Sequence, residues 1–121
     1  MHMIMLVLDD PKQLDSVLDA WRSAGVSGVT IVETVGAYRR ETRRVRGRYL
    51  YGLPGLAESA ERSQYTLFAI VPDAGAVDMC LEAAEGIIGD LMQARTGVFA
   101  AWELSSAKGV PDELGQPGNE E

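Results

Sequence analysis

The order strand, helix, strand is expected twice along this chain, and this repetition most limits its possible folds. In the first half, the continuous apolar run 3–8 predicts a buried strand. Asp10 and Pro11 then provide a helix cap and a residue suited to the first helical turn. Apolar side chains follow at i, i+3, i+4 and i+7, and Gly25 is expected to end this helix. The β-branched run 29–35 predicts a second strand.

The second half repeats this order. Residues 65–71 predict a strand, Pro72 and Asp73 open a helix, and 77–88 keep helical spacing. Residues 98–104 predict the fourth strand. Two strand-helix-strand units joined by a long connection indicate an α+β, ferredoxin-like split βαβ fold (βαββαβ). We therefore expect a four-stranded antiparallel sheet with both helices on one face.

The predicted strands are apolar on both faces, although helices are expected to cover only one of them. The run 3–8 has no polar position, and 67–71 and 98–102 also lack polar alternation. Monomers rarely leave so large an apolar surface exposed to water. We therefore predict that other copies of the chain cover the second sheet face. The alternative is a loop or tail that folds over the sheet.

Six of the eleven basic residues lie between positions 39 and 48, where only Glu41 opposes them. This Arg-rich segment carries a net charge of about +5, and the rest of the chain about −12. Guanidinium groups bind phosphate and carboxylate groups bidentately, so the segment predicts an anionic ligand or an acidic partner surface. A solvated loop without a ligand is the alternative. The candidate partner-binding residues are Arg43, Arg44, Arg46, Arg48, Tyr49 and Tyr51.

The composition argues against several classes of protein. Cys80 and His2 are the only residues of their types, which does not favour a disulfide framework, a metal site or a catalytic triad. The net charge of −7 does not favour nucleic-acid binding. No stretch predicts membrane insertion, so we expect a cytoplasmic protein. We expect a single domain over 1–104, including the long Arg-rich loop 36–63, followed by an acidic, flexible tail over 105–121.

Several of these features resemble the PII-like signalling proteins, and the resemblance covers about residues 3 to 104. Its most specific part is the stretch 24–33, Ala-Gly-Val-Ser-Gly-Val-Thr-Ile-Val-Glu, followed by Gly36 and Arg39. That family shows a glycine-x-x-glycine-x-threonine turn into its second strand, and then the base of a long loop, the T-loop. Residues 70–73, Ile-Val-Pro-Asp, are similar to the family's third strand and second helix. The resemblance implies a homotrimer.

The resemblance also implies a ligand site in a cleft between subunits, which in many members takes an adenine nucleotide. The stretch 93–98 departs from the family's glycine-aspartate-glycine-lysine phosphate loop, so the cofactor stays unknown. The basic residues that the family carries beyond its last strand are absent at 105–108. Carried over by position, the candidate ligand-binding residues are Thr30, Gly36, Tyr38, Arg39, Arg40, Arg95, Thr96 and Gly97.

The leading hypothesis is therefore a non-enzymatic, trimeric regulator or sensor. It would bind a small anionic metabolite, a nucleotide for example, and signal through the Arg-rich loop to a protein partner. The second hypothesis is an interaction module that uses the arginines without a small ligand. The third is an enzyme of the α+β-barrel kind, which forms dimers and requires a proton-transfer residue in its pocket.

Overall fold

The computed structural model describes residues 1–36, 64–93 and 96–110. Two strand-helix-strand units follow one another, as expected, and the whole is the βαββαβ order of a ferredoxin-like α+β fold. The elements are β1 (His2–Leu8), the 3-10 turn η1 (Pro11–Gln13), α1 (Leu14–Ser23), β2 (Val29–Thr34), β3 (Gln64–Val71), α4 (Ala74–Ile88) and β4 (Gly97–Glu103).

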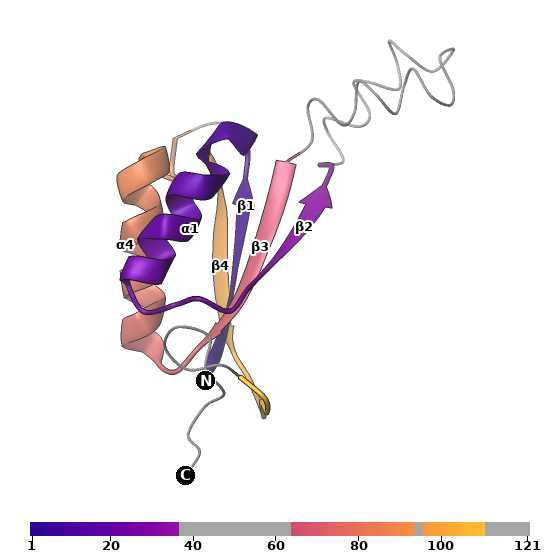
Figure 1. Ribbon diagram of the computed structural model, residues 1–121, viewed down its shortest axis with the longest axis vertical. Coiled ribbons are helices and arrows are strands. Elements are labelled where there is room, and N and C mark those ends of the chain that lie inside the picture. Colours follow the sequence, from indigo (N-terminus) through magenta and orange to yellow (C-terminus); the bar gives the residue numbers. More distant parts are fainter. Residues whose placement is uncertain (37–63, 94–95, 111–121) are drawn as a thin grey trace, which may run out of the picture.

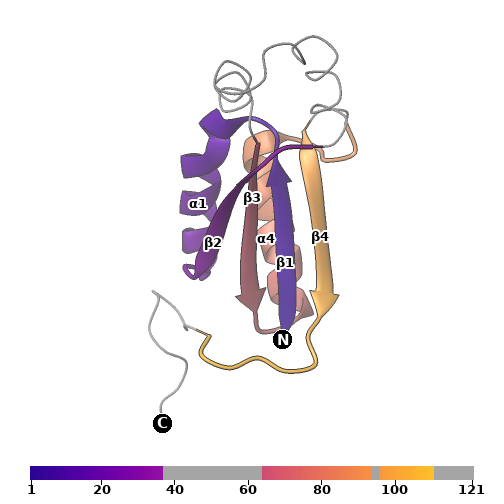
Figure 2. The same ribbon diagram turned by 90° about the vertical axis from the view of Figure 1, so that its right-hand side faces the viewer.

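The four strands form one antiparallel sheet in the order β2-β3-β1-β4. Both helices lie against the same face of this sheet (Figure 1), and the other face carries no helix (Figure 2). We call the helix-free surface the open face. The central strand β1 pairs Met5 with Phe68 of β3 and with Ala100 of β4, which fixes the register across the sheet.

The hydrophobic core lies between the helices and the sheet. Alternate residues of β1 and β3 point into it, as the two-residue repeat of a strand requires. Among the described residues, no helix combines the length and the apolar character needed to cross a bilayer. The buried core residues are Ile4, Leu6, Leu8, Val17, Trp21, Leu67, Ala69, Val71, Cys80, Ala84 and Ile88.

Aspartates begin both helical segments, as the sequence predicts. Asp73 caps α4 by accepting a hydrogen bond from the Ala76 amide at 2.8 Å. Asp10 accepts a bond from the Lys12 amide at 3.0 Å, only two residues along the chain. The Gln13 amide donates to the Asp10 carbonyl at 3.0 Å, three residues along the chain, so this turn is a 3-10 turn and the α-helical part begins only at Leu14.

Gly25 ends α1 in the predicted place, and its φ of 98° lies in the left-handed region. Its amide donates to the Arg22 carbonyl and the Val26 amide donates to the Trp21 carbonyl, both at 2.9 Å. These two bonds form a Schellman motif, which reverses the chain and satisfies the last helical carbonyls. The motif directs residues 26–28 to the start of β2.

Candidate functional site

The open face carries no charged side chain on any of its four strands. Each strand alternates between core and open-face positions, and the register aligns the open-face positions in rows across the sheet. The polar positions lie on β2 and on the neighbouring end of β3, whereas β1 and β4 present only apolar side chains. The open-face residues are Thr30, Val32, Thr34, Gln64, Thr66, Phe68, Ile70, Met3, Met5, Val7, Val98, Ala100 and Trp102.

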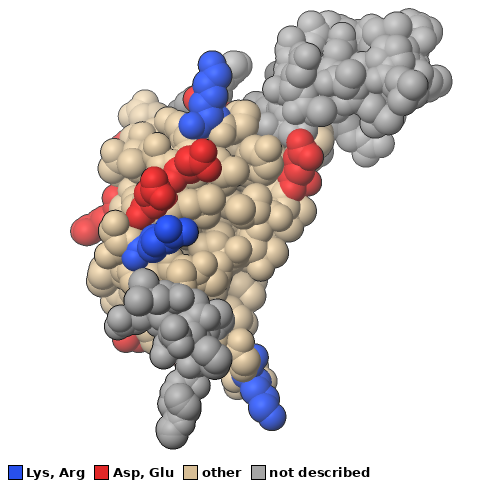
Figure 3. All heavy atoms as spheres, in the orientation of Figure 1, with Lys and Arg blue, Asp and Glu red and all other residues tan. Residues whose placement is uncertain are grey.

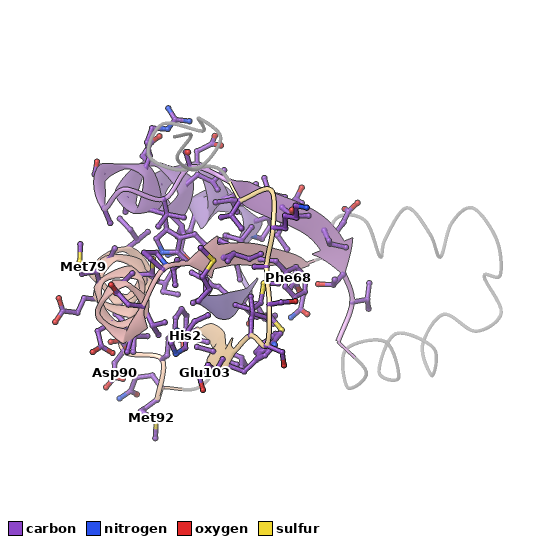
Figure 4. All side chains as sticks on the ribbon, turned by 90° about the horizontal axis from the view of Figure 1, so that it is seen from below. His2, Phe68, Met79, Asp90, Met92 and Glu103 are labelled. Atoms are coloured by element: carbon purple, nitrogen blue, oxygen red, sulfur yellow. The ribbon has the colours of Figure 1, made fainter. Side chains whose placement is uncertain are left out.

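Large apolar side chains of this face are partly exposed to water in the single chain. Val98 is 55% exposed, Trp102 45% and Val32 41%. Figure 4 shows Phe68 on the side of the sheet away from both helices. In the view of Figure 3, by contrast, charged side chains gather mainly over the helical layer. A contiguous apolar surface of this kind is characteristic of an interaction site.

A cavity of about 400 Å³ lies at the corner of the open face where β2 begins. The turn before β2, the strands β1, β2 and β3, and one residue that follows β4 contribute to its walls. Its lining contains no charged side chain. The lining residues are Met3, Ser27, Gly28, Val29, Thr30, Phe68, Ala69, Ile70 and Val110.

Hydroxyl groups supply the polar side-chain chemistry of this cavity. Thr30, one of the candidate ligand-binding residues, lines it from β2. The Ser27 Oγ is buried and has no hydrogen-bond partner among the described residues. The Ser27 oxygen is closed off from solvent, so the exposed Thr30 supplies the hydroxyl that a ligand in the cavity could reach. Apolar walls with a few hydroxyls suit a neutral ring.

Gly36 lies at the opposite end of β2, where the chain leaves the sheet. A Cβ atom at this glycine would lie 3.6 Å from the Oε1 of Gln64, an ordinary contact distance. Gln64 in turn donates from Nε2 to the Oδ1 of Asp9 at 2.9 Å. The Thr34 and Thr66 hydroxyls are hydrogen-bonded at 2.8 Å, which ties β2 to β3 near this end. The base of the Arg-rich loop is thus anchored by polar side chains.

Thr96 and Gly97 both have structural roles at the start of β4. The Thr96 hydroxyl donates to the Gln93 carbonyl at 2.9 Å and stabilises the turn before the strand. Gly97 has a φ of 148°, and a Cβ atom there would overlap the Val7 carbonyl oxygen. No side chain fits in that space, so the close approach of β1 and β4 accounts for this glycine.

One chain does not bring the candidate residues together. The strand order puts Gly36 and Gly97 at opposite edges of the sheet, three strand spacings or roughly 14 Å apart. Thr30 faces a third region, the cavity at the other end of β2. Within one chain these three groups therefore lie in three separate regions. The other candidates, Tyr38, Arg39, Arg40, Arg43, Arg44, Arg46, Arg48, Tyr49, Tyr51 and Arg95, lie outside the described residues.

Several cavity residues were not identified from the sequence. Phe68 and Ile70 were expected to lie on a sheet surface, but the register was needed to align them with Met3. Val110 belongs to the segment expected to be a flexible tail, and only its position in space makes it part of the site. Within the described ranges, no three His, Cys, Asp or Glu side chains are grouped so as to hold a metal ion.

Comparison of the sequence with models of protein families gives no match, and comparison with curated proteins gives none either.

Proposed function

We propose that this chain is the subunit of a non-enzymatic, PII-like trimeric regulator. Copies cover one another's open faces, and a small anionic metabolite, a nucleotide for example, binds in the cleft that this packing creates. Binding changes the arrangement of residues 36–63 and thereby their contact with a partner protein. The observation that carries the proposal is the charge-free open face with a cavity at its β2 corner.

Two chemically different surfaces support a ligand with a ring and an anionic group. The cavity has apolar walls from Met3, Phe68 and Ile70 together with the Thr30 hydroxyl, which suits a ring. The anionic part would be bound by arginines of the sequence, with Arg39 and Arg40 following Gly36 along the chain. The separation of Gly36 from Gly97 within one chain further supports a site shared between copies.

The experiment is a thermal-shift screen against ATP, ADP, AMP and other phosphorylated metabolites at millimolar concentration. A ligand at a hundred times its Kd should stabilise the folded state by about 2.7 kcal/mol. Thr30→Val and Arg39→Ala should each reduce the shift, since one removes the cavity hydroxyl and the other a guanidinium. Ser16→Ala, at an exposed position of α1, is the control and should leave the shift unchanged. If none of these metabolites stabilises the protein, the regulator proposal fails.

One observation favours a second candidate, an interaction module without a small ligand. The Thr96 hydroxyl is hydrogen-bonded to the Gln93 carbonyl, and the close approach of β1 and β4 accounts for Gly97, so neither residue needs a phosphate ligand to explain it. In this case the arginines would bind an acidic partner permanently. Co-purification that fails when Arg43, Arg44, Arg46 and Arg48 are replaced by alanine, without any metabolite response, would support this module.

A further inference from the structure

The chain that follows β4 crosses below the end of the sheet. The Leu104 amide donates to the Met1 carbonyl at 2.9 Å and fixes the point of departure. Residues 105–110, which we call the strap, then pass from the β4 edge to the β2 edge (Figure 2). Gly109 turns the chain with a φ of 78°, and Val110 reaches the cavity wall. The strap thereby joins the last strand to the cavity at the opposite edge of the sheet.

The strap is held weakly between its two ends. Residues 105–109 are exposed, and no hydrogen bond joins residues 105–110 to the rest of the described chain. Val110 is only partly buried, so its apolar contact stabilises the closed strap less than a fully buried valine would. A contact this weak allows closed and open arrangements to be populated together. A ligand that contacts Val110 can therefore shift the balance toward the closed arrangement.

We propose that the strap is a clamp for the cavity, and that a neutral, planar ligand in the cavity and closure of the strap stabilise each other. The clamp rests on the proposed function in one respect only, that this cavity is a ligand site. A ligand on the floor formed by Met3, Phe68 and Ile70 gains a further apolar contact from Val110. The contact is made only when the strap is closed. A ligand in the cavity should consequently slow proteolytic cleavage of the strap.

Cleavage of the strap by trypsin can report this coupling. Lys108 is exposed within the strap, so trypsin can cleave after it when the strap is open. The rate of this cleavage, followed by mass spectrometry of the full chain, measures the open population. The neutral planar dye Nile red serves as the ligand, and its fluorescence gives the Kd.

In the wild-type protein, saturating dye should slow cleavage after Lys108 about three- to tenfold. Val110→Ser should weaken dye binding by a similar factor, because the apolar contact is lost. The same variant should show no protection by the dye. Ala107→Ser, in the strap but not in the cavity lining, is the matched control and should behave as the wild type does.

Two results would overturn the clamp. One is equal dye affinity in the wild type and in Val110→Ser, and the other is a Lys108 cleavage rate that dye leaves unchanged. Ile70→Asp places a charge in the cavity and should abolish dye binding; if it does not, the dye binds elsewhere and the clamp is refuted. Circular dichroism confirms that each variant is folded. Failure of the metabolite screen would refute the regulator but not the coupling between the ligand and closure of the strap, so the two proposals are tested separately.

Discussion

The indole Nε1 of Trp21 donates a hydrogen bond to the main-chain carbonyl oxygen of Cys80 at 3.0 Å. Both residues are fully buried, so this bond joins α1 to α4 inside an otherwise apolar layer. The first helix and the second helix come from different halves of the chain. A directional bond between them fixes their relative position over the sheet, which apolar packing alone would leave less well defined.

Trp21→Phe should destabilise the fold. The variant removes the bond to the Cys80 carbonyl and leaves a smaller ring in a closely packed space, and the expected loss is about 1–3 kcal/mol. Urea unfolding followed by circular dichroism measures it. Trp102→Phe, at a half-exposed position of β4, is the control and should change the free energy of unfolding less at the same protein concentration. Equal effects of the two substitutions would contradict the role given to the buried bond.

The stability of the protein should fall at high pH because of Cys80. Burial raises the pKa of this thiol from 9.0 to about 11. The unfolded chain therefore releases the thiol proton at a lower pH than the folded chain. Cys80 makes no difference below about pH 9, and the folded state loses stability between pH 9 and 11, by about 2–3 kcal/mol at most.

Comparing wild type with Cys80→Ala by urea unfolding at pH 8 and pH 11 isolates this effect. The alanine variant should lose less stability between the two pH values than the wild type does. A thiol reagent at pH 8 should also react with the native protein far more slowly than with the unfolded chain. Rapid reaction of the native thiol would show that Cys80 is not buried in solution.

Replacing either of two glycines by alanine should change the stability of the fold, in opposite directions for the two positions. Gly97→Ala brings a Cβ atom against the Val7 carbonyl oxygen and should destabilise the fold by more than about 2 kcal/mol. Gly86 lies within α4, and a Cβ atom there meets nothing within 4 Å. Gly86→Ala should therefore stabilise the fold by about 0.5–1 kcal/mol, the difference in helix propensity. Thermal unfolding of both variants tests the pairing of β1 with β4.

If copies of the chain cover the open face, charge on that face should separate them. Trp102→Lys and Val98→Lys should each shift the protein from the trimer toward the monomer, because burying an unpaired ammonium group is strongly unfavourable. Light scattering at low micromolar concentration gives the mass of the species. Met79→Lys is the control, because Met79 is similarly exposed but projects from α4 away from the sheet (Figure 4). A wild-type protein that is already monomeric would refute the trimer.

Much of the fold could be predicted because its signals are local. The apolar runs gave the strands to within one or two residues, and Asp73 and Gly25 correctly marked a helix start and a helix end. The 3-10 turn at 11–13 was not predicted, because a capping aspartate and a proline suit the first turn of an α-helix as well as a 3-10 turn.

The candidate site was less predictable because distant segments form it. Thr30 was identified from a motif and does line the cavity, whereas Ser27 and Val110 become cavity residues only through folding. Sequence position alone makes Gly97 a candidate ligand-binding residue. Its need for glycine comes from a carbonyl oxygen ninety residues earlier in the chain, at Val7, which no local pattern reveals.

The absence of charge from the strands of the open face determines how its contacts respond to conditions. Contacts made through apolar surface gain most of their free energy from the release of water, and this gain weakens on cooling. Sulfate strengthens such contacts, and moderate concentrations of sodium chloride leave them nearly unchanged because the four strands of this face hold no charges to be screened. Whatever covers this surface should consequently separate from it more readily in the cold.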